Sequence, residues 1–92
     1  MKDYSNMPPA RNFLRVLKSC PKAALVYIDL WKKRSQITYV VRVIKEDIRK
    51  EYLISPTIYR NQLSSLAYLN LISYQENDDE YQIDVSGSNT DE

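Results

Sequence analysis

The sequence predicts a small α+β domain that is mainly helical, with one short strand and a C-terminal β-hairpin. Two stretches, 11–18 and 22–33, carry apolar residues with the spacing of one helix face. The stretch 72–85 instead alternates apolar and polar residues around Asn77-Asp78-Asp79, a typical tight-turn sequence. With 92 residues, of which 43% are hydrophobic, the chain suffices for one modest core. We therefore expect a single folded domain at 11–85.

The N-terminal region is predicted to be an arm followed by an extra helix. Residues 1–10 include Pro8 and Pro9 and show no periodic pattern, so we interpret them as a flexible arm. The helix expected at 11–18 has three apolar residues on one side, Phe13, Leu14 and Leu17. After Pro21, which suits a first helical turn, the pattern at 22–33 predicts the central helix of the core.

The middle of the chain is predicted to form a strand and a helix. Residues 36–44 are rich in β-branched residues and Tyr, which favour a strand. The stretch 45–53 then has Ile48 and Tyr52 on one side, and Glu46 lies one turn before Lys50, as in a stabilised helix.

A further helix is predicted at 56–69, because Ser55 is a good N-cap and Pro56 suits the first helical position. Its expected core stripe is Ile58, Tyr59, Leu63, Leu66 and Leu69. Its expected exposed face is rich in hydrogen-bonding groups and consists of Thr57, Arg60, Asn61, Ser64 and Tyr68. Residues 86–92, beyond the hairpin, are small, polar and acidic, and we interpret them as a disordered tail.

The composition argues against most enzyme chemistries. The chain has one cysteine and no histidine, which argues against a zinc site and against Ser-His or Cys-His nucleophile pairs. Its one glycine lies near the end, so no glycine-rich phosphate loop is present. We expect no enzymatic activity, no cofactor and no metal. No 18-residue apolar stretch and no secretory signal are present, so we expect a cytoplasmic protein without a membrane span.

The charges are distributed unevenly along the chain. All 13 Lys and Arg residues lie within residues 1–60, which carry a net charge of +8. Residues 61–92 contain seven acids and no base. This asymmetry indicates a basic face for a polyanion, an acidic appendage, or both.

The predicted order of helix, strand, helix, turn, helix and hairpin resembles the winged helix-turn-helix superfamily of small prokaryotic and phage regulators. The resemblance is carried by 45–55, which looks like a first helix and its turn, and by 56–66, which looks like a recognition helix. Asn70-Leu71-Ile72 stands where such families usually have Gly-Leu-Ile or Gly-Leu-Val before the wing.

The resemblance implies a DNA-binding protein that reads the major groove of double-stranded DNA with helix 56–69. By position, the implied base readers are Thr57, Arg60, Asn61 and Ser64. The implied phosphate contacts are Ser55, Lys45, Arg49 and Lys50. Such residues also occur on ordinary solvated helix faces.

The acidic hairpin tip at 76–80 supports an alternative function, in which the chain is an adaptor that binds another protein. Carboxylates there would be repelled by phosphate, and Asp78, Asp79 and Glu80 would instead face a basic protein surface. The helix at 11–18 also suits a homodimer through Phe13 and Leu17, which we favour over the alternative that it packs within one chain.

Overall fold

A computed structural model describes residues 7–86, so most of the expected N-terminal arm and nearly all of the acidic tail lie outside the described residues. Within this range the chain forms four α-helices, a short 3-10 helix and one three-stranded antiparallel sheet. The elements are α1 (Ala10–Ser19), η2 (Pro21–Ala23), α2 (Ala24–Lys33), β1 (Val40–Ile44), α3 (Lys45–Tyr52), α4 (Pro56–Tyr68), β2 (Ser73–Glu76) and β3 (Glu80–Asp84). The expected α+β class, with a short strand and a C-terminal hairpin, is confirmed. None of the described helices is long and apolar enough to cross a membrane.

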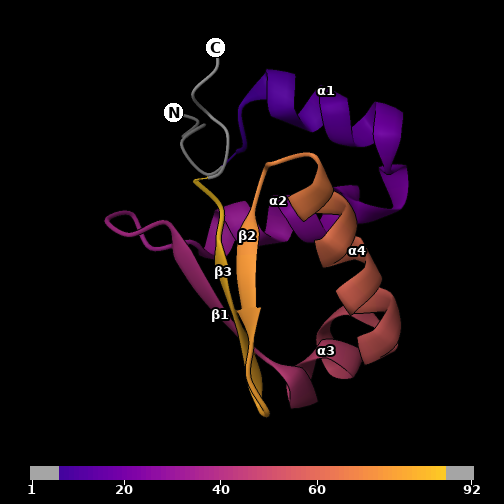
Figure 1. The fold of residues 1–92 in the computed structure, drawn as a ribbon, viewed down its shortest axis with the longest axis vertical. Helices are drawn as coiled ribbons and strands as arrows, with labels where there is room; N and C mark the ends of the chain where they lie inside the picture. Colours follow the sequence, from indigo (N-terminus) through magenta and orange to yellow (C-terminus); the bar gives the residue numbers. More distant parts are fainter. Residues whose placement is uncertain (1–6, 87–92) are drawn as a thin grey trace.

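The sheet has the strand order β1-β3-β2, so the last strand lies in the middle (Figure 1). Strand β3 pairs with β1 from Val40 opposite Asp84 to Ile44 opposite Glu80. It also pairs with β2 through the hairpin, with Glu76 opposite Tyr81. The C-terminal strand of the hairpin, β3, is therefore hydrogen-bonded to β1 on one side and to β2 on the other.

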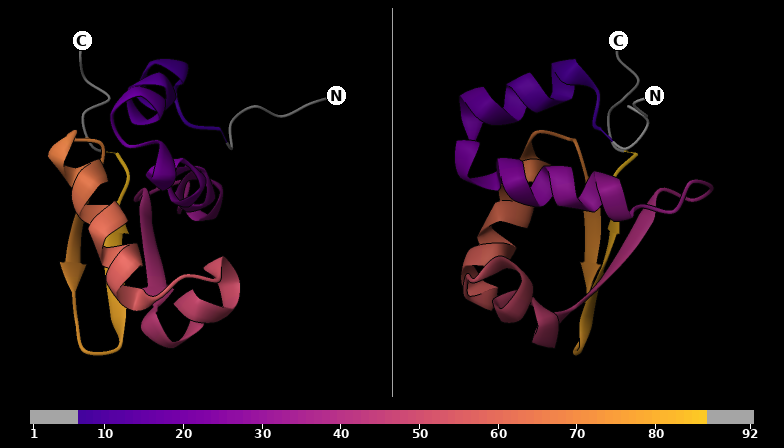
Figure 2. Two further views of the ribbon diagram at one scale, coloured as in Figure 1. Left: turned by 90° about the vertical axis from the view of Figure 1, so that its right-hand side faces the viewer. Right: turned by 180° about the vertical axis from the view of Figure 1, so that it is seen from behind.

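One face of the sheet is covered by helix and the other is open. Helix α2 crosses behind the sheet in Figure 1 and in front of it in the reverse view of Figure 2. The covered face and the helices share one hydrophobic core, whose largest fully buried side chains include Tyr27, Leu30, Ile48, Tyr59, Leu63, Leu66, Tyr81 and Ile83. Trp31, at 5% exposed, also belongs to it, as the helical spacing of 22–33 predicts.

The segment 36–39 is not part of the strand, which corrects the sequence expectation. The Ser35 hydroxyl accepts hydrogen bonds from the amides of Ile37 and Thr38, both at 3.2 Å, and closes a turn. Tyr39 then has a φ of 61°, which breaks the extended backbone before β1 begins at Val40. Ile37 is 90% exposed, so its β-branched side chain packs on nothing.

Helices α3 and α4 are joined by a turn in which Leu53 has the left-handed φ of 60°. Its amide bonds the Arg49 carbonyl at 3.1 Å and closes the end of α3. At the other end of α4, Asn70 has a φ of 62°, the conformation expected of Asn at this position. These two residues set the directions in which the chain enters and leaves α4.

Candidate functional site

Helix α4 begins at a defined cap and contains no acidic residue. The Ser55 hydroxyl accepts a hydrogen bond from the Ile58 amide at 3.1 Å, which confirms the expected N-cap. The helix buries Tyr59, Leu63 and Leu66, and its single charged residue is Arg60. Ile58, which was expected in the core stripe, is 46% exposed, because the buried stripe is narrower than predicted.

The four α4 residues that the resemblance implies as base readers are all exposed: Thr57, Arg60, Asn61 and Ser64. Three of them share one line along the helix with Tyr68, since they follow one another at intervals of four, three and four residues. Tyr68 is 86% exposed at the end of this line. The outward line of α4 is thus uncharged and rich in hydrogen-bonding groups, and Arg60 lies beside it.

Arg60 is held by the hairpin. Its Nε donates to Oε1 of Glu76 at 3.1 Å and its Nη2 donates to Oε2 at 2.7 Å, so the two side chains form a forked pair. The Lys45 ammonium, at the start of α3, donates to the same Oε2 at 2.7 Å. One carboxylate of β2 therefore joins the side chains of α3 and α4.

This cluster of Arg60, Glu76 and Lys45 carries a net charge of +1. Hydrogen bonds from Arg60 and then from Lys45 lower the pKa of Glu76 to about 2, which keeps the carboxylate charged at all moderate pH values. The contacts with Glu76, and next with the Tyr81 hydroxyl, raise the pKa of Arg60 above its usual value. Among the three side chains Arg60 is the most exposed, at 48%, against 31% for Glu76 and 25% for Lys45.

A row of four tyrosines packs beneath this side of α4. Ring centroids are 5.1 Å apart for Tyr52 and Tyr59, 5.8 Å for Tyr59 and Tyr81, and 6.0 Å for Tyr81 and Tyr74. The row runs from α3 through α4 into the hairpin. At its end, the hydroxyls of Tyr74 and Ser64 are 3.0 Å apart and share a hydrogen bond. The hairpin is therefore fastened to α4 by both Ser64 and Arg60.

The other side of α4 borders an open groove. Ile58, Asn61, Gln62 and Ser65 line it on the helix side, and residues 19–23 line it opposite, with a volume of about 510 Å³. An adjoining hollow of about 350 Å³ continues the groove to Tyr68 and Leu69. The one charged residue lining either part is Lys22.

The segment beside this groove is basic, a feature that the sequence interpretation missed. Residues 10–28 contain four cations, Arg11, Arg15, Lys18 and Lys22, and no acid. Arg15 reaches across to the C-terminal end of α4, where its Nη2 donates to the carbonyl of the capping residue Leu69 at 2.8 Å. The long acid-free run was visible in the sequence, but only the fold places it next to α4.

The basic residues of α3, which were predicted to contact phosphates, are accompanied by acidic residues, unlike those of α1 and η2. Arg49 and Lys50 are exposed, whereas Lys45 is engaged by Glu76. Helix α3 has three bases and three acids, so it is neutral overall. By contrast, α1, η2 and α4 contain no acidic residue.

The hairpin tip carries fewer uncompensated carboxylates than the sequence suggests. Glu80 binds the Arg42 guanidinium at 2.8 Å, and Glu76 binds Arg60 and Lys45. Asp78 and Asp79 are exposed, and neither forms an ion pair with any residue between 7 and 86. Of the three residues expected to face a basic protein, these two are therefore available and Glu80 is paired internally.

Helix α1 divides its apolar residues between the core and the surface. Phe13 is half-buried and packs against the core of its own chain. Leu14 and Leu17 are exposed, at 55% and 41%. The surface expected to bind a second copy thus contains Leu14 and Leu17, whereas Phe13 mainly packs internally.

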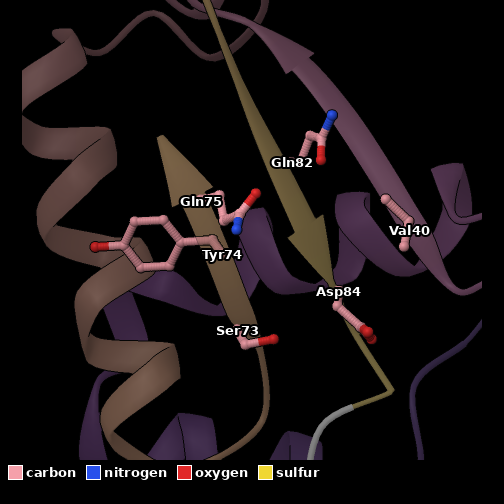
Figure 3. Close-up of a pocket in the computed structure, with 6 residues that line it drawn as sticks. All are labelled: Val40, Ser73, Tyr74, Gln75, Gln82 and Asp84. Atoms are coloured by element: carbon pink, nitrogen blue, oxygen red, sulfur yellow. The ribbon is translucent and has the colours of Figure 1, made fainter. Parts of the chain in front are cut away.

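The open face of the sheet contains a polar hollow of about 370 Å³ (Figure 3). Ser73, Gln75, Gln82 and Asp84 line it with Val40. Tyr74 points sideways, toward the neighbouring helix, as its hydrogen bond to Ser64 requires (Figure 3). Asp84 already accepts a hydrogen bond from the Ser86 amide at 2.8 Å. The hollow thus presents two side-chain amides, the Ser73 hydroxyl and the Asp84 carboxylate.

Metal-binding and nucleophilic groups are sparse in the described part. No group of three or more His, Cys, Asp or Glu residues within 7–86 is arranged to hold a metal ion. Burial raises the pKa of the Cys20 thiol, so it stays protonated and weakly nucleophilic near neutral pH. The candidate site is thus defined by cations and hydrogen-bonding groups around α4.

Comparison of the chain with protein-family models, with curated proteins and with solved structures finds no match.

Proposed function

We propose that this chain is a double-stranded DNA-binding protein of the winged-helix kind, in which α4 enters the major groove. The observation that carries the proposal is an exposed, acid-free α4 with basic residues of α1 and η2 alongside it. Hydrogen-bonding side chains such as Thr57 and Asn61 suit base edges, and the flanking cations suit phosphates. The proposal covers transcriptional regulation or an accessory role in the cytoplasm, with no cofactor and no catalytic step.

The arrangement of elements supports this proposal. Helix α3, the turn at Leu53 and helix α4 follow one another as the helix-turn-helix resemblance requires. The hairpin of β2 and β3 follows α4, the position at which a winged helix would have its wing. One fold hosts many functions, so the functional part of the proposal depends on the surface of α4.

The phosphate contacts that the fold favours differ in part from those implied by the resemblance. Arg15 bonds the Leu69 carbonyl at the end of α4, Lys22 lines the groove beside α4, and Lys18 is an exposed cation of the acid-free α1. Ser55 and the N-terminus of α4 are suited to an anion. Arg49 and Lys50 supply a second set from α3. Asp78 and Asp79 keep the hairpin tip away from the DNA backbone, because like charges repel.

The test is a salt titration of binding to mixed-sequence duplex DNA, measured by fluorescence anisotropy. We expect binding that weakens steeply as salt rises, since each phosphate contact releases counterions. Replacing Lys18 and Lys22 by Gln should reduce the slope of log affinity against log salt by about 1.8, which corresponds to two lost contacts. No binding by the wild-type protein at low salt would contradict the proposal.

A matched control is available in α2. Lys32 is exposed on that helix and lies outside the groove, so Lys32→Gln removes one charge without removing a proposed contact. We expect its salt slope to equal that of the wild type. A slope that falls equally for any lysine would instead indicate a general effect of net charge.

Dimerisation through α1 is part of the same proposal. Leu14 and Leu17 are exposed one turn apart, and a symmetric dimer would place two copies of α4 on two half-sites. Sedimentation equilibrium should then show a dimer that dissociates when both leucines are replaced by Ser. A wild-type protein that is monomeric at all concentrations would remove this part of the proposal.

The second candidate function is that of a protein-binding adaptor, and the exposed Asp78 and Asp79 favour it. Their carboxylates suit a basic protein surface. If this function is correct, replacing both by Asn should weaken binding to an affinity-purified partner, and the DNA titration should be unaffected. Retention of the partner by the Asn variant would argue against the adaptor.

A further inference from the structure

We propose that Glu76 is a positioning residue that holds Arg60 in the orientation needed to read a guanine in the major groove. This inference rests on the proposed DNA-binding function. In this inference the hairpin contributes to base recognition through Glu76, although the acidic hairpin tip itself does not contact the DNA.

The first argument is that Glu76 binds the guanidinium of Arg60 through two hydrogen bonds on one side of the group. Glu76 bonds Nε and Nη2, which lie along one side of the group, at 3.1 and 2.7 Å. The Nη1 end is not engaged by Glu76. Guanine is recognised through O6 and N7 by a pair of N–H donors of one arginine. Glu76 uses Nε and one hydrogen of Nη2, and Arg60 also contacts the Tyr81 hydroxyl, so such a pair would come from the Nη1 and Nη2 hydrogens that point away from these two partners.

The second argument is that Glu76 reduces the freedom of a flexible side chain. An arginine on a helix surface has many rotamers, and ordering it on binding costs conformational entropy. Here the carboxylate comes from a paired strand, since Glu76 lies opposite Tyr81 in the sheet. The tyrosine row beneath it joins this strand to α4. Arg60 is therefore ordered before any ligand binds.

The third argument concerns charge, because a carboxylate near DNA is ordinarily unfavourable. Lys45 donates to Glu76 at 2.7 Å and leaves the cluster with a net charge of +1. Lys45 itself lies over the Tyr81 ring, with its ammonium 5.3 Å from the centroid. A positively charged cluster can approach the duplex, whereas an arginine and a carboxylate alone would be neutral.

The experiment begins with selection of duplexes from a library with a randomised core, using immobilised full-length protein. Affinities are then measured for the selected duplex and for versions in which each selected guanine is replaced by adenine. We expect one guanine at which the wild type discriminates by about ten-fold or more. In Glu76→Gln this discrimination should fall toward one, because the amide can accept only one of the two hydrogen bonds. Arg60→Lys should lose the same preference, since lysine lacks the fork.

Two control variants distinguish an effect on the orientation of Arg60 from an effect of the net charge of the protein. Glu80→Gln makes the same charge change on the same hairpin but releases Arg42, not Arg60, and should keep the guanine preference. Lys45→Gln removes a cation from the cluster and should weaken binding to all duplexes without changing the preference. Thermal unfolding by circular dichroism confirms that each variant is folded before its affinities are compared.

The effect expected of Glu76→Gln also differs from simple damage to the fold. Its preference for guanine should fall while its affinity for mixed-sequence DNA stays equal or rises, since a negative charge is removed. A misfolded variant would lose both.

The outcomes distinguish this inference from the proposed function. A wild-type protein that binds no duplex contradicts both. A wild type that binds without a guanine preference at any position overturns the inference and leaves DNA binding in place. The inference is also overturned, with DNA binding left in place, if Glu76→Gln binds every duplex more tightly and keeps its guanine preference. Glu76 would then only compete with phosphate for Arg60.

Discussion

The hydroxyl of Tyr52 in α3 donates a hydrogen bond to the Asp29 carboxylate in α2. The same carboxylate lies 3.1 Å from the Lys33 ammonium, which also contacts Glu51 at 2.7 Å. These four side chains form a polar link between α2 and α3 at the border of the core. Burial is the main cause that raises the pKa of Tyr52, and the bond to Asp29 adds to it.

Replacing Tyr52 by Phe should therefore lower the free energy of unfolding by about 1 kcal/mol, the usual net contribution of one hydrogen bond. The ring stays in place, so packing against Tyr59 is retained. Tyr68→Phe is the matched control, because that side chain is 86% exposed and should change stability very little. Equal urea midpoints for the two variants would show that the link to Asp29 contributes nothing.

The stability of the wild type should depend on pH through Glu76. Its pKa is about 2 in the folded chain, below the ordinary 4.5, so the folded state favours the carboxylate. This contribution is complete above the ordinary pKa and is lost as pH falls toward 2. Urea unfolding between pH 6 and 2 should show the wild type losing stability relative to Glu76→Gln. NMR titration of the carboxyl carbon should give a midpoint near 2, and a midpoint near 4.5 would contradict the geometry.

Removing the cap of α4 should destabilise the domain. In Ser55→Ala the Ile58 amide loses its side-chain acceptor, and we expect a loss of about 1 kcal/mol in the free energy of unfolding. Ser55→Asp keeps an acceptor at the same place and should retain most of the stability. Both values come from chemical denaturation, and equal losses in the two variants would mean that the cap bond is unimportant.

Leu53→Gly should stabilise the protein, because Leu53 has a φ of 60° and is 85% exposed. A leucine in the left-handed conformation costs roughly 1 kcal/mol, and glycine avoids most of it, although it loses more backbone entropy on folding. We expect a net gain of about 0.5 kcal/mol. Leu25→Gly, at an exposed position in the first turn of α2, should instead lower stability, by up to about 1 kcal/mol. Stability changes of the same sign would contradict this account.

Most elements were predictable because periodicity and capping residues act locally. Ser55 and Pro56 marked the start of α4, and Asn70 marked the chain reversal after it. The expectation for 36–39 was wrong because a turn around the Ser35 hydroxyl overrode β-propensity. Ile58 was misplaced because helical spacing gives the direction of a side chain but not the width of the surface that covers it.

Predicting the candidate site required knowledge of tertiary contacts. The outward residues Thr57 and Asn61 followed from helical spacing alone. The pairing of Arg60 with Glu76 did not, since it depends on how the hairpin lies against α4. The basic flank was missed for a related reason, because the closeness of Lys22 to α4 is a property of the fold.

The position of β3 in the sheet has a consequence for synthesis on the ribosome. Each strand pair between residues 7 and 86 includes β3, although β3 is the last strand to be translated. The nascent chain therefore has only helices to pack until Glu80–Asp84 emerges, and β1 must wait through the synthesis of α3, α4 and β2. A premature stop codon before Glu80 would remove both strand pairs at once, and with them the support that Glu76 gives to Arg60.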